Sequence, residues 1–242
     1  MKRLKMAFRH AVTASLLVPA MSAITAHAAT ATFFGPSAYL SAANIPVGFY
    51  GSGSPTFLDN LEDGTLDGNL TGSAGVVLKP SDPFGGFVDS VDGDNGAIDG
   101  NGSRAHSWFS GDGPNGVRFS FGGGILPTAF GLVWTDGGGT ITFSALDGNG
   151  NSLGSQIFAG FSDDSILGTT AEDRFFGVQF ADGIKSIFIS NSNGGIEVDH
   201  IQYGAMEALP PPTGTVPEPE TLALSLAALA LMGFVRRNRR LV

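Results

Sequence analysis

Short apolar stretches recur along the second half of the chain, and turn-forming residues separate them at intervals of about 8–12 residues. Val117, Phe119 and Phe121 alternate with polar neighbours, as in a strand with one buried face. No stretch of this region has the apolar spacing of an amphipathic helix. The 36 glycines and 13 prolines agree, because both residues interrupt long helices. The pattern predicts an all-β fold, an antiparallel β-sandwich of the jelly-roll type.

The segments between the expected strands are predicted from their turn residues. Residues 147–152 and 191–195 are rich in Asp, Asn, Ser and Gly, so each is expected to be a turn. Residues 81–116 carry few large apolar side chains and are expected to form a long loop. Residues 29–50 are interpreted as an edge strand or an irregular packed arm. The strands expected most clearly are 76–78, 117–121, 128–135, 140–146, 153–158, 174–180, 184–190 and 196–203.

The first 28 residues have the three parts of a secretory signal peptide. Four basic residues precede an apolar stretch from Ala11 to Ala26, and Ala26, His27 and Ala28 form a small-x-small cleavage site. A retained membrane anchor is the alternative, but Pro19 interrupts its helix. Residues 1–28 are therefore predicted to be removed on export.

The C-terminal end combines a proline-rich triplet, an apolar run and a cluster of basic residues. The run from Leu222 to Val235 would rise only about 21 Å as a helix, which is less than a bilayer core of about 30 Å. Its faces are all apolar, however, and the arginines that follow can reach the lipid headgroups. We expect a short transmembrane helix at about 221–235, and a helix packed on the domain is the alternative. The membrane-stop residues would be Arg236, Arg237, Arg239 and Arg240.

The C-terminal end resembles the PEP-CTERM sorting signal. It contains Pro217, Glu218 and Pro219, and the expected helix and the arginines follow them. The resemblance implies recognition by exosortase, a membrane-embedded peptidase-like enzyme that would remove the tail near these three residues. Segments 61–68, 89–100, 170–180 and 195–204 resemble a recurring domain of exported PEP-CTERM proteins. The implied organisation is a signal peptide at 1–28, a β-sandwich domain at 29–209, a Pro-rich linker at 210–216 and the sorting signal at 217–242.

The charge of the exported part limits its partners. Five basic side chains stand against 22 acidic ones between residues 29 and 220, a net charge of −17. Such a surface repels nucleic acid phosphates, so a nucleic-acid partner is excluded. The chain has no cysteine, which excludes disulfides, thiolate nucleophiles and cysteine zinc sites. The acidic side chains serve solubility or bind a divalent cation.

Calcium is the expected cation, because carboxylate and carbonyl oxygens are its usual ligands. Asp92, Asp94, Asn95 and Asp99 crowd one glycine-rich segment, although Gly96 stands where an EF-hand needs Asp or Asn. The last three strands are also similar to calcium-binding jelly rolls of the carbohydrate-binding type. That resemblance implies that Glu62 and Asp199 share one structural calcium.

Other residue patterns give weaker evidence for a functional site. Ser152 fits G-x-S-x-G by letter, but two strands flank it instead of a strand and a helix, so we interpret it as chance. His200 follows Asp199 in a strand, where neighbours point to opposite faces, and is expected to be a hydrogen-bonded histidine, as is His106. For sugar stacking we expect Trp108, which lies beside the predicted loop, whereas Trp134 is expected in the core.

The sequence predicts an exported, non-enzymatic protein of the cell surface or the extracellular matrix. It would be held in the membrane by its C-terminal helix before exosortase acts, and it would bind polysaccharide. A secreted glycan hydrolase that uses paired carboxylates is the alternative. A purely structural matrix protein without a specific ligand is a third possibility.

Overall fold

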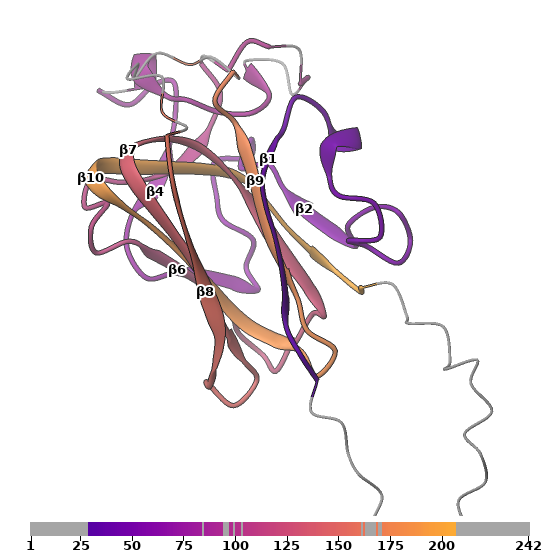
Figure 1. The fold of residues 1–242 in the computed structure, drawn as a ribbon. Helices are drawn as coiled ribbons and strands as arrows, with labels where there is room; N and C mark the ends of the chain where they lie inside the picture. The colour runs from indigo at the N-terminus through magenta and orange to yellow at the C-terminus, as the bar shows by residue number, and fades with distance from the viewer. Residues whose placement is uncertain are drawn as a thin grey trace, which may run out of the picture.

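The computed structural model describes residues 29–83, 85–93, 97–98, 100–102, 104–160, 162, 168 and 171–206. These residues form ten β-strands and two short 3-10 helices, so the all-β prediction is confirmed (Figure 1). The signal peptide, linker and tail helix of the sequence prediction lie outside them. Among the described residues, no helix has the length and apolar character needed to cross a bilayer. The elements are β1 Thr32–Ala38, η1 Ala42–Asn44, β2 Phe57–Asp59, β3 Leu70–Gly72, β4 Val76–Leu78, η2 Gly85–Phe87, β5 Ser107–Ser110, β6 Val117–Phe121, β7 Ala129–Asp147, β8 Ser152–Ala159, β9 Arg174–Gln179 and β10 Ile184–Gly204.

Two long, curved strands, β7 and β10, connect the layers of the sandwich (Figure 1). They pair with each other along most of their length. The first half of β7 also pairs with β9, which carries β1 at its other edge, and the second half of β7 pairs with β8. The first part of β10 pairs with β6, and its later part pairs with β5 and β2. Every one of these pairings is antiparallel, as expected.

The β9–β7–β10 sheet is buried on both faces. Leu132 and Phe176 point into the main core, whereas their neighbours Val133 and Phe175 point into a second cluster on the opposite face. Tyr39, Phe49 and Tyr50 from the segment after β1 complete that second cluster. Burial on both faces explains the nearly continuous apolar sequence of the first half of β7, which alternation alone does not predict.

The two glycine-rich breaks expected within these strands are not chain reversals. Residues 191–195 were predicted to be a turn, but β10 continues through them, and the expected strands 128–135 and 140–146 are one strand, β7. The hydrogen-bonded pairing of β7 with β10 continues across both breaks with register shifts, and Asn193 pairs with Gly138. Gly137 and Gly139 have φ angles of 152° and 92°, which favour glycine. The two strands thus bend together at bulges in place of reversing.

The expected loop 81–116 contains a strand, which corrects the sequence prediction. Residues 107–110 form β5, which pairs with β10 on one side and β4 on the other. Four residues between loop segments give too short an apolar pattern to identify from sequence. This strand decides where Trp108 lies.

Candidate metal centre

A bulge in β10 brings two neighbouring side chains into one cluster. Asp199 pairs with Val133 and Gln202 pairs with Gly131, so β10 has one residue more than β7 in this interval. His200 lies in the bulge with a φ angle of 44°, in the left-handed region that non-glycine residues seldom adopt. Asp199 and His200 were expected on opposite faces, but the bulge breaks the alternation and both side chains contribute to one cluster.

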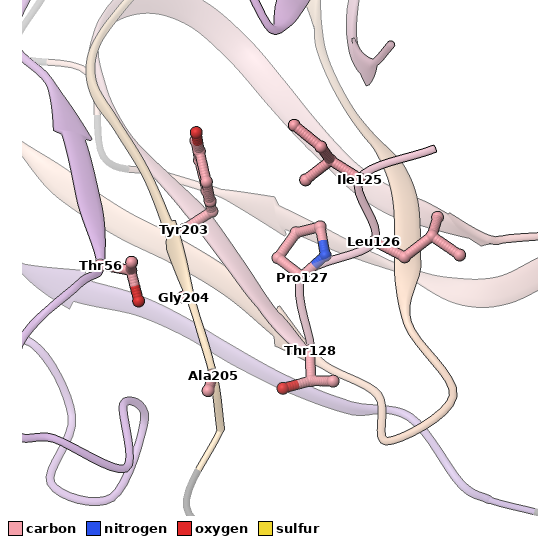
Figure 2. Close-up of a pocket in the computed structure, with 8 residues that line it drawn as sticks. All are labelled: Thr56, Ile125, Leu126, Pro127, Thr128, Tyr203, Gly204 and Ala205. Carbon is pink, nitrogen blue, oxygen red and sulfur yellow. The ribbon is translucent and has the colours of Figure 1, made fainter. Parts of the chain in front are cut away.

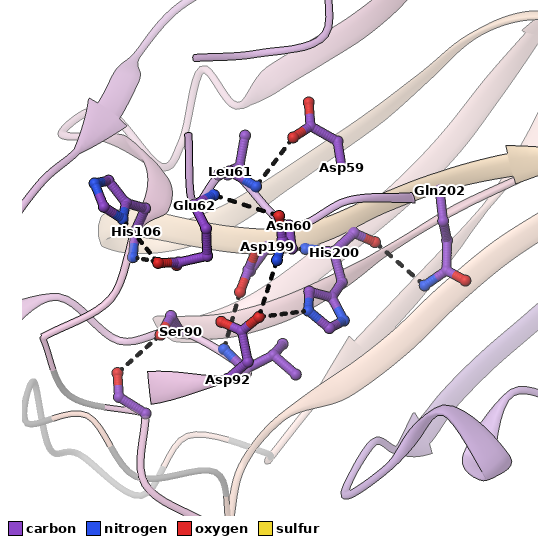
Figure 3. Close-up of polar contacts among 12 residues, drawn as sticks. Asp59, Asn60, Leu61, Glu62, Ser90, Asp92, His106, Asp199, His200 and Gln202 are labelled. Atoms are coloured by element: carbon purple, nitrogen blue, oxygen red, sulfur yellow. Dashed lines mark hydrogen bonds and ion pairs between the residues drawn. The ribbon is translucent and has the colours of Figure 1, made fainter. Parts of the chain in front are cut away.

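The cluster consists of Asp92, Asp199 and His200, whose potential ligand atoms all lie within 4.8 Å of one another (Figure 3). Asp199 accepts hydrogen bonds from the backbone N–H of Val91 at 3.0 Å and of His200 at 2.6 Å. Oδ2 of Asp92 lies 3.3 Å from His200 Nε2 and accepts a hydrogen bond from Asn60 at 3.3 Å. The other oxygen, Oδ1, is buried and accepts no hydrogen bond from any described residue.

The cluster combines two buried carboxyl groups with one imidazole ring. Burial raises the pKa of Asp199 to about 7, and the positive charge of His200 opposes this rise. Burial alone would lower the pKa of His200, but the negative charges of Asp199 and Asp92 raise it by more. Two carboxylates therefore face at most one imidazolium in a site where all three residues are at most 3% exposed. The unpartnered oxygen of Asp92 is an atom that a divalent cation could bind.

Of the two residues expected to share a calcium, only Asp199 belongs to this cluster. Glu62 lies nearby but is engaged with His106, whose backbone N–H it binds at 2.9 Å and whose Nδ1 it meets at 3.1 Å (Figure 3). Asp92 comes from the acidic segment that the sequence pointed to, and Asp94, Asn95 and Asp99 of that segment lie outside the described residues. His200 was not expected, because no sequence pattern locates the bulge.

Trp108, the residue expected to stack on sugars, lies in the core. It pairs with Val77 on one side and Val198 on the other, and only 8% of it is exposed. Its indole N–H donates a hydrogen bond to Ala74 O at 2.9 Å, and its ring packs edge-on against Phe119. Strand β5 thus leaves no open ring face for a sugar.

Ser152 begins β8 after a hairpin turn, and its hydroxyl accepts a hydrogen bond from Gly154 N–H at 3.1 Å.

An open apolar hollow lies at the end of β10 (Figure 2). Its volume is about 270 Å³. Ile125 and Leu126 are 36% and 43% exposed beside it. Tyr203 forms part of the wall and is held by stacking on Phe57 and by a hydrogen bond from its hydroxyl to Asp67. The lining residues are Thr56, Ile125, Leu126, Pro127, Thr128, Tyr203, Gly204 and Ala205.

Comparison with known protein families gives a match at the C-terminal end. Residues 215–240 match the model of the PEP-CTERM protein-sorting motif. The chain carries a PEP-CTERM sorting motif. The matched residues include Pro217, Glu218 and Pro219 and the four arginines, which confirms the resemblance seen in the sequence. The PEP-CTERM motif indicates an exported protein that is processed by exosortase.

Solved structures give more distant similarities, and no curated protein matches the sequence. The enzymatically active domain of tailspike protein 4 of bacteriophage CBA120 is 15% identical with a TM-score of 0.30, over 60% of this chain and 21% of that chain. The C-terminal family 22 carbohydrate-binding module of Clostridium thermocellum Xyn10B is 15% identical with a TM-score of 0.27, over 68% of this chain and 99% of that chain. This chain thus spans about a fifth of the tailspike chain.

Proposed function

We propose that this exported PEP-CTERM protein is a non-enzymatic component of the cell surface or extracellular matrix, and that it folds around a calcium ion held by Asp92 and Asp199. The observation that carries the proposal is the buried Oδ1 of Asp92, which has no hydrogen-bond partner among the described residues and belongs to a cluster of three potential metal ligands. Asn60 and His200 fix the other oxygen of Asp92, so Oδ1 is the atom left for an ion. Oxygen ligands favour calcium.

Burial favours this role over glycan hydrolysis. A glycosidase needs two carboxylates that reach a sugar bound between them. Asp92 and Asp199 are at most 1% exposed, and Glu172 and Glu197 are 2% and 4% exposed. These side chains cannot touch a polymer outside the protein without a large rearrangement. Assays for new reducing ends on extracellular polysaccharides should give no activity, and release of sugars would support the hydrolase alternative.

Thermal melts of the full-length chain test the calcium proposal. Calcium at about 100 times its dissociation constant should stabilise the fold by about 2.7 kcal/mol, which corresponds to an increase in Tm of roughly 5–10 °C over the chelator-treated chain. Asp199→Asn should show a smaller increase than the wild-type chain. Asp182→Asn is the matched control, because Asp182 is exposed in the turn before β10, and it should keep the full increase. Equal melting of the wild-type chain in calcium and in chelator would contradict the proposal.

As a second function, we propose that polysaccharide binds at the hollow beside Tyr203 and Leu126. Sugar rings present C–H faces that pack on apolar and aromatic side chains, and exposed apolar residues gather beside this hollow. Its place at the surface contrasts with the burial of Trp108. The two proposals are independent, since the hollow shares no residue with the metal cluster.

Affinity electrophoresis in gels that contain the cell's own extracellular polysaccharide tests this second function. Leu126→Asp should abolish the retardation of the full-length chain. Ile157→Asp is the matched control, because Ile157 is an exposed apolar residue on β8 and is 68% exposed. The control should be retarded as the wild-type chain is. Equal retardation of both variants would remove the hollow as the binding site.

A further inference from the structure

A second pair of acidic side chains lies on the same face of the β9–β7–β10 sheet as Asp199. Phe175, Val133 and Asp199 form one row across the three strands on that face. Trp134 pairs with Arg174, so the next row on this face contains Thr135 of β7 and Asp173, the residue before β9. Asp173 and Asp199 flank β7 on opposite sides and two residues apart along it, so their backbones are about 12 Å apart.

Asp89 packs against this second row of residues, on the face of the sheet that carries Thr135. Its carbonyl oxygen accepts a hydrogen bond from the hydroxyl of Thr135 at 2.9 Å. Its backbone N–H donates to the carboxylate of Glu197, which also accepts a hydrogen bond from Ser107. Two strands therefore fix the backbone of Asp89. Gly102 packs closely against this segment, because a Cβ at that position would collide with the carbonyl oxygen of Ser90 and would lie 3.1 Å from Oδ1 of Asp89.

Neither carboxylate of this second pair is neutralised by a hydrogen bond. Asp89 and Asp173 are 0% exposed, and none of their four oxygens has a hydrogen-bond partner among the described residues. Burial raises the pKa of each to about 9, and further acids add to the rise, Asp173 for Asp89 and Asp199 for Asp173. Arg174 donates hydrogen bonds to the backbone oxygens of Ala171 and Asp173, and its positive charge offsets only part of the rise in the pKa of Asp173. Buried carboxylates without partners are costly unless a proton or a cation neutralises them.

We propose that Asp89 and Asp173 bind a second divalent cation, separate from the one proposed at Asp92 and Asp199. Oxygen is the only ligand type that the pair offers, which favours a hard cation such as calcium. Asp89 and Asp92 belong to the same short segment, so the two ions would attach that segment to the sheet at two points. This arrangement would explain why a segment with few apolar side chains is buried from Val88 to Asp92.

Radioactive calcium binding to the full-length chain in equilibrium dialysis tests the second site. Asp173→Asn should bind one ion fewer than the wild-type chain, and Asp199→Asn should also bind one ion fewer. Asp182→Asn should bind the wild-type number. If Asp173→Asn keeps its near-UV circular dichroism and binds as many ions as the wild-type chain, the second site is overturned.

Crystals of the full-length chain soaked with terbium give a result that needs no variant. We expect one anomalous peak between the carboxylates of Asp89 and Asp173 and another beside Asp92 and Asp199. A peak only at Asp92 and Asp199 would overturn the second site and leave the proposed function intact. A peak only at Asp89 and Asp173 would support the second site and overturn the calcium site proposed at Asp92 and Asp199. The absence of both peaks would overturn both proposed sites.

Discussion

His200 is the residue at which β10 departs from regular geometry, and the cluster depends on that departure. A left-handed φ in a non-glycine residue costs roughly 1–2 kcal/mol, so surrounding contacts must hold it. The ring of His200 is held from both sides, by Tyr39 OH at 3.2 Å from Nδ1 and by Asp92 at Nε2. The sequence indicated the acidic segment with Asp92. It could not indicate His200, because the bulge is set by pairing with β7 and not by local residue preference.

Removal of the Tyr39 hydroxyl tests whether this support stabilises the fold. Tyr39→Phe should lower the free energy of unfolding by about 1–2 kcal/mol, because a buried polar group of His200 loses its partner. Urea denaturation should show a lower midpoint with an unchanged slope. Tyr50→Phe is the matched control, since the Tyr50 hydroxyl lies 3.4 Å from Gln202 and makes a weaker bond. A loss for Tyr39→Phe no larger than for the control would contradict the supporting role.

At the scale of elements, β7 and β10 show where strand prediction works and where it fails. Alternation and apolar runs located most of the strand residues, because those signals are local. The glycine-rich segment at 191–195 was predicted to be a turn, but β10 bends there at a bulge and continues. Whether a break reverses the chain or bends it depends on the partner strand, and here two breaks lie opposite each other. The expected turn at 147–152 is a true hairpin, because β7 and β8 pair on both sides of it.

Asp147 in that hairpin makes a pH-dependent contribution to stability. Its carboxylate accepts hydrogen bonds from Asn151 Nδ2 at 3.0 Å and from the backbone N–H groups of Asn149 and Asn151. The hydrogen bond from the Asn151 side chain is the largest cause of its lowered pKa. A lowered pKa in the folded state adds stability above the usual pKa of Asp, and this stability disappears as the pH falls through the folded value.

Asp147→Asn should therefore be less stable than the wild-type chain at pH 7, and the difference should be smaller at a pH well below the usual pKa of Asp. Urea denaturation at both pH values measures the difference. Asp182→Asn, an exposed turn variant, should show a smaller difference at pH 7. A stability gap for Asp147→Asn that does not change with pH would contradict the role of the ionised carboxylate.

Across the whole molecule, the sorting motif and the metal cluster differ in how far apart their residues lie along the chain. The PEP-CTERM motif is contiguous, so its residues were all recognisable from sequence. The cluster joins residues 92, 199 and 200, with support from Tyr39 and Asn60, and only folding brings these segments together. The sequence indicated Asp199 and the acidic segment with Asp92 as possible cation ligands, but it did not indicate that they meet at His200. An exported domain with several buried carboxyl groups would reach its fully folded state only where calcium is available to bind them.

Isothermal titration of calcium into the chelator-stripped, full-length chain measures directly whether the domain binds calcium. We expect saturable binding to the wild-type chain, reduced by one ion in Asp199→Asn and unchanged in Asp182→Asn. The absence of a saturable binding signal in the wild-type chain, with the fold retained by circular dichroism, would contradict the calcium proposal.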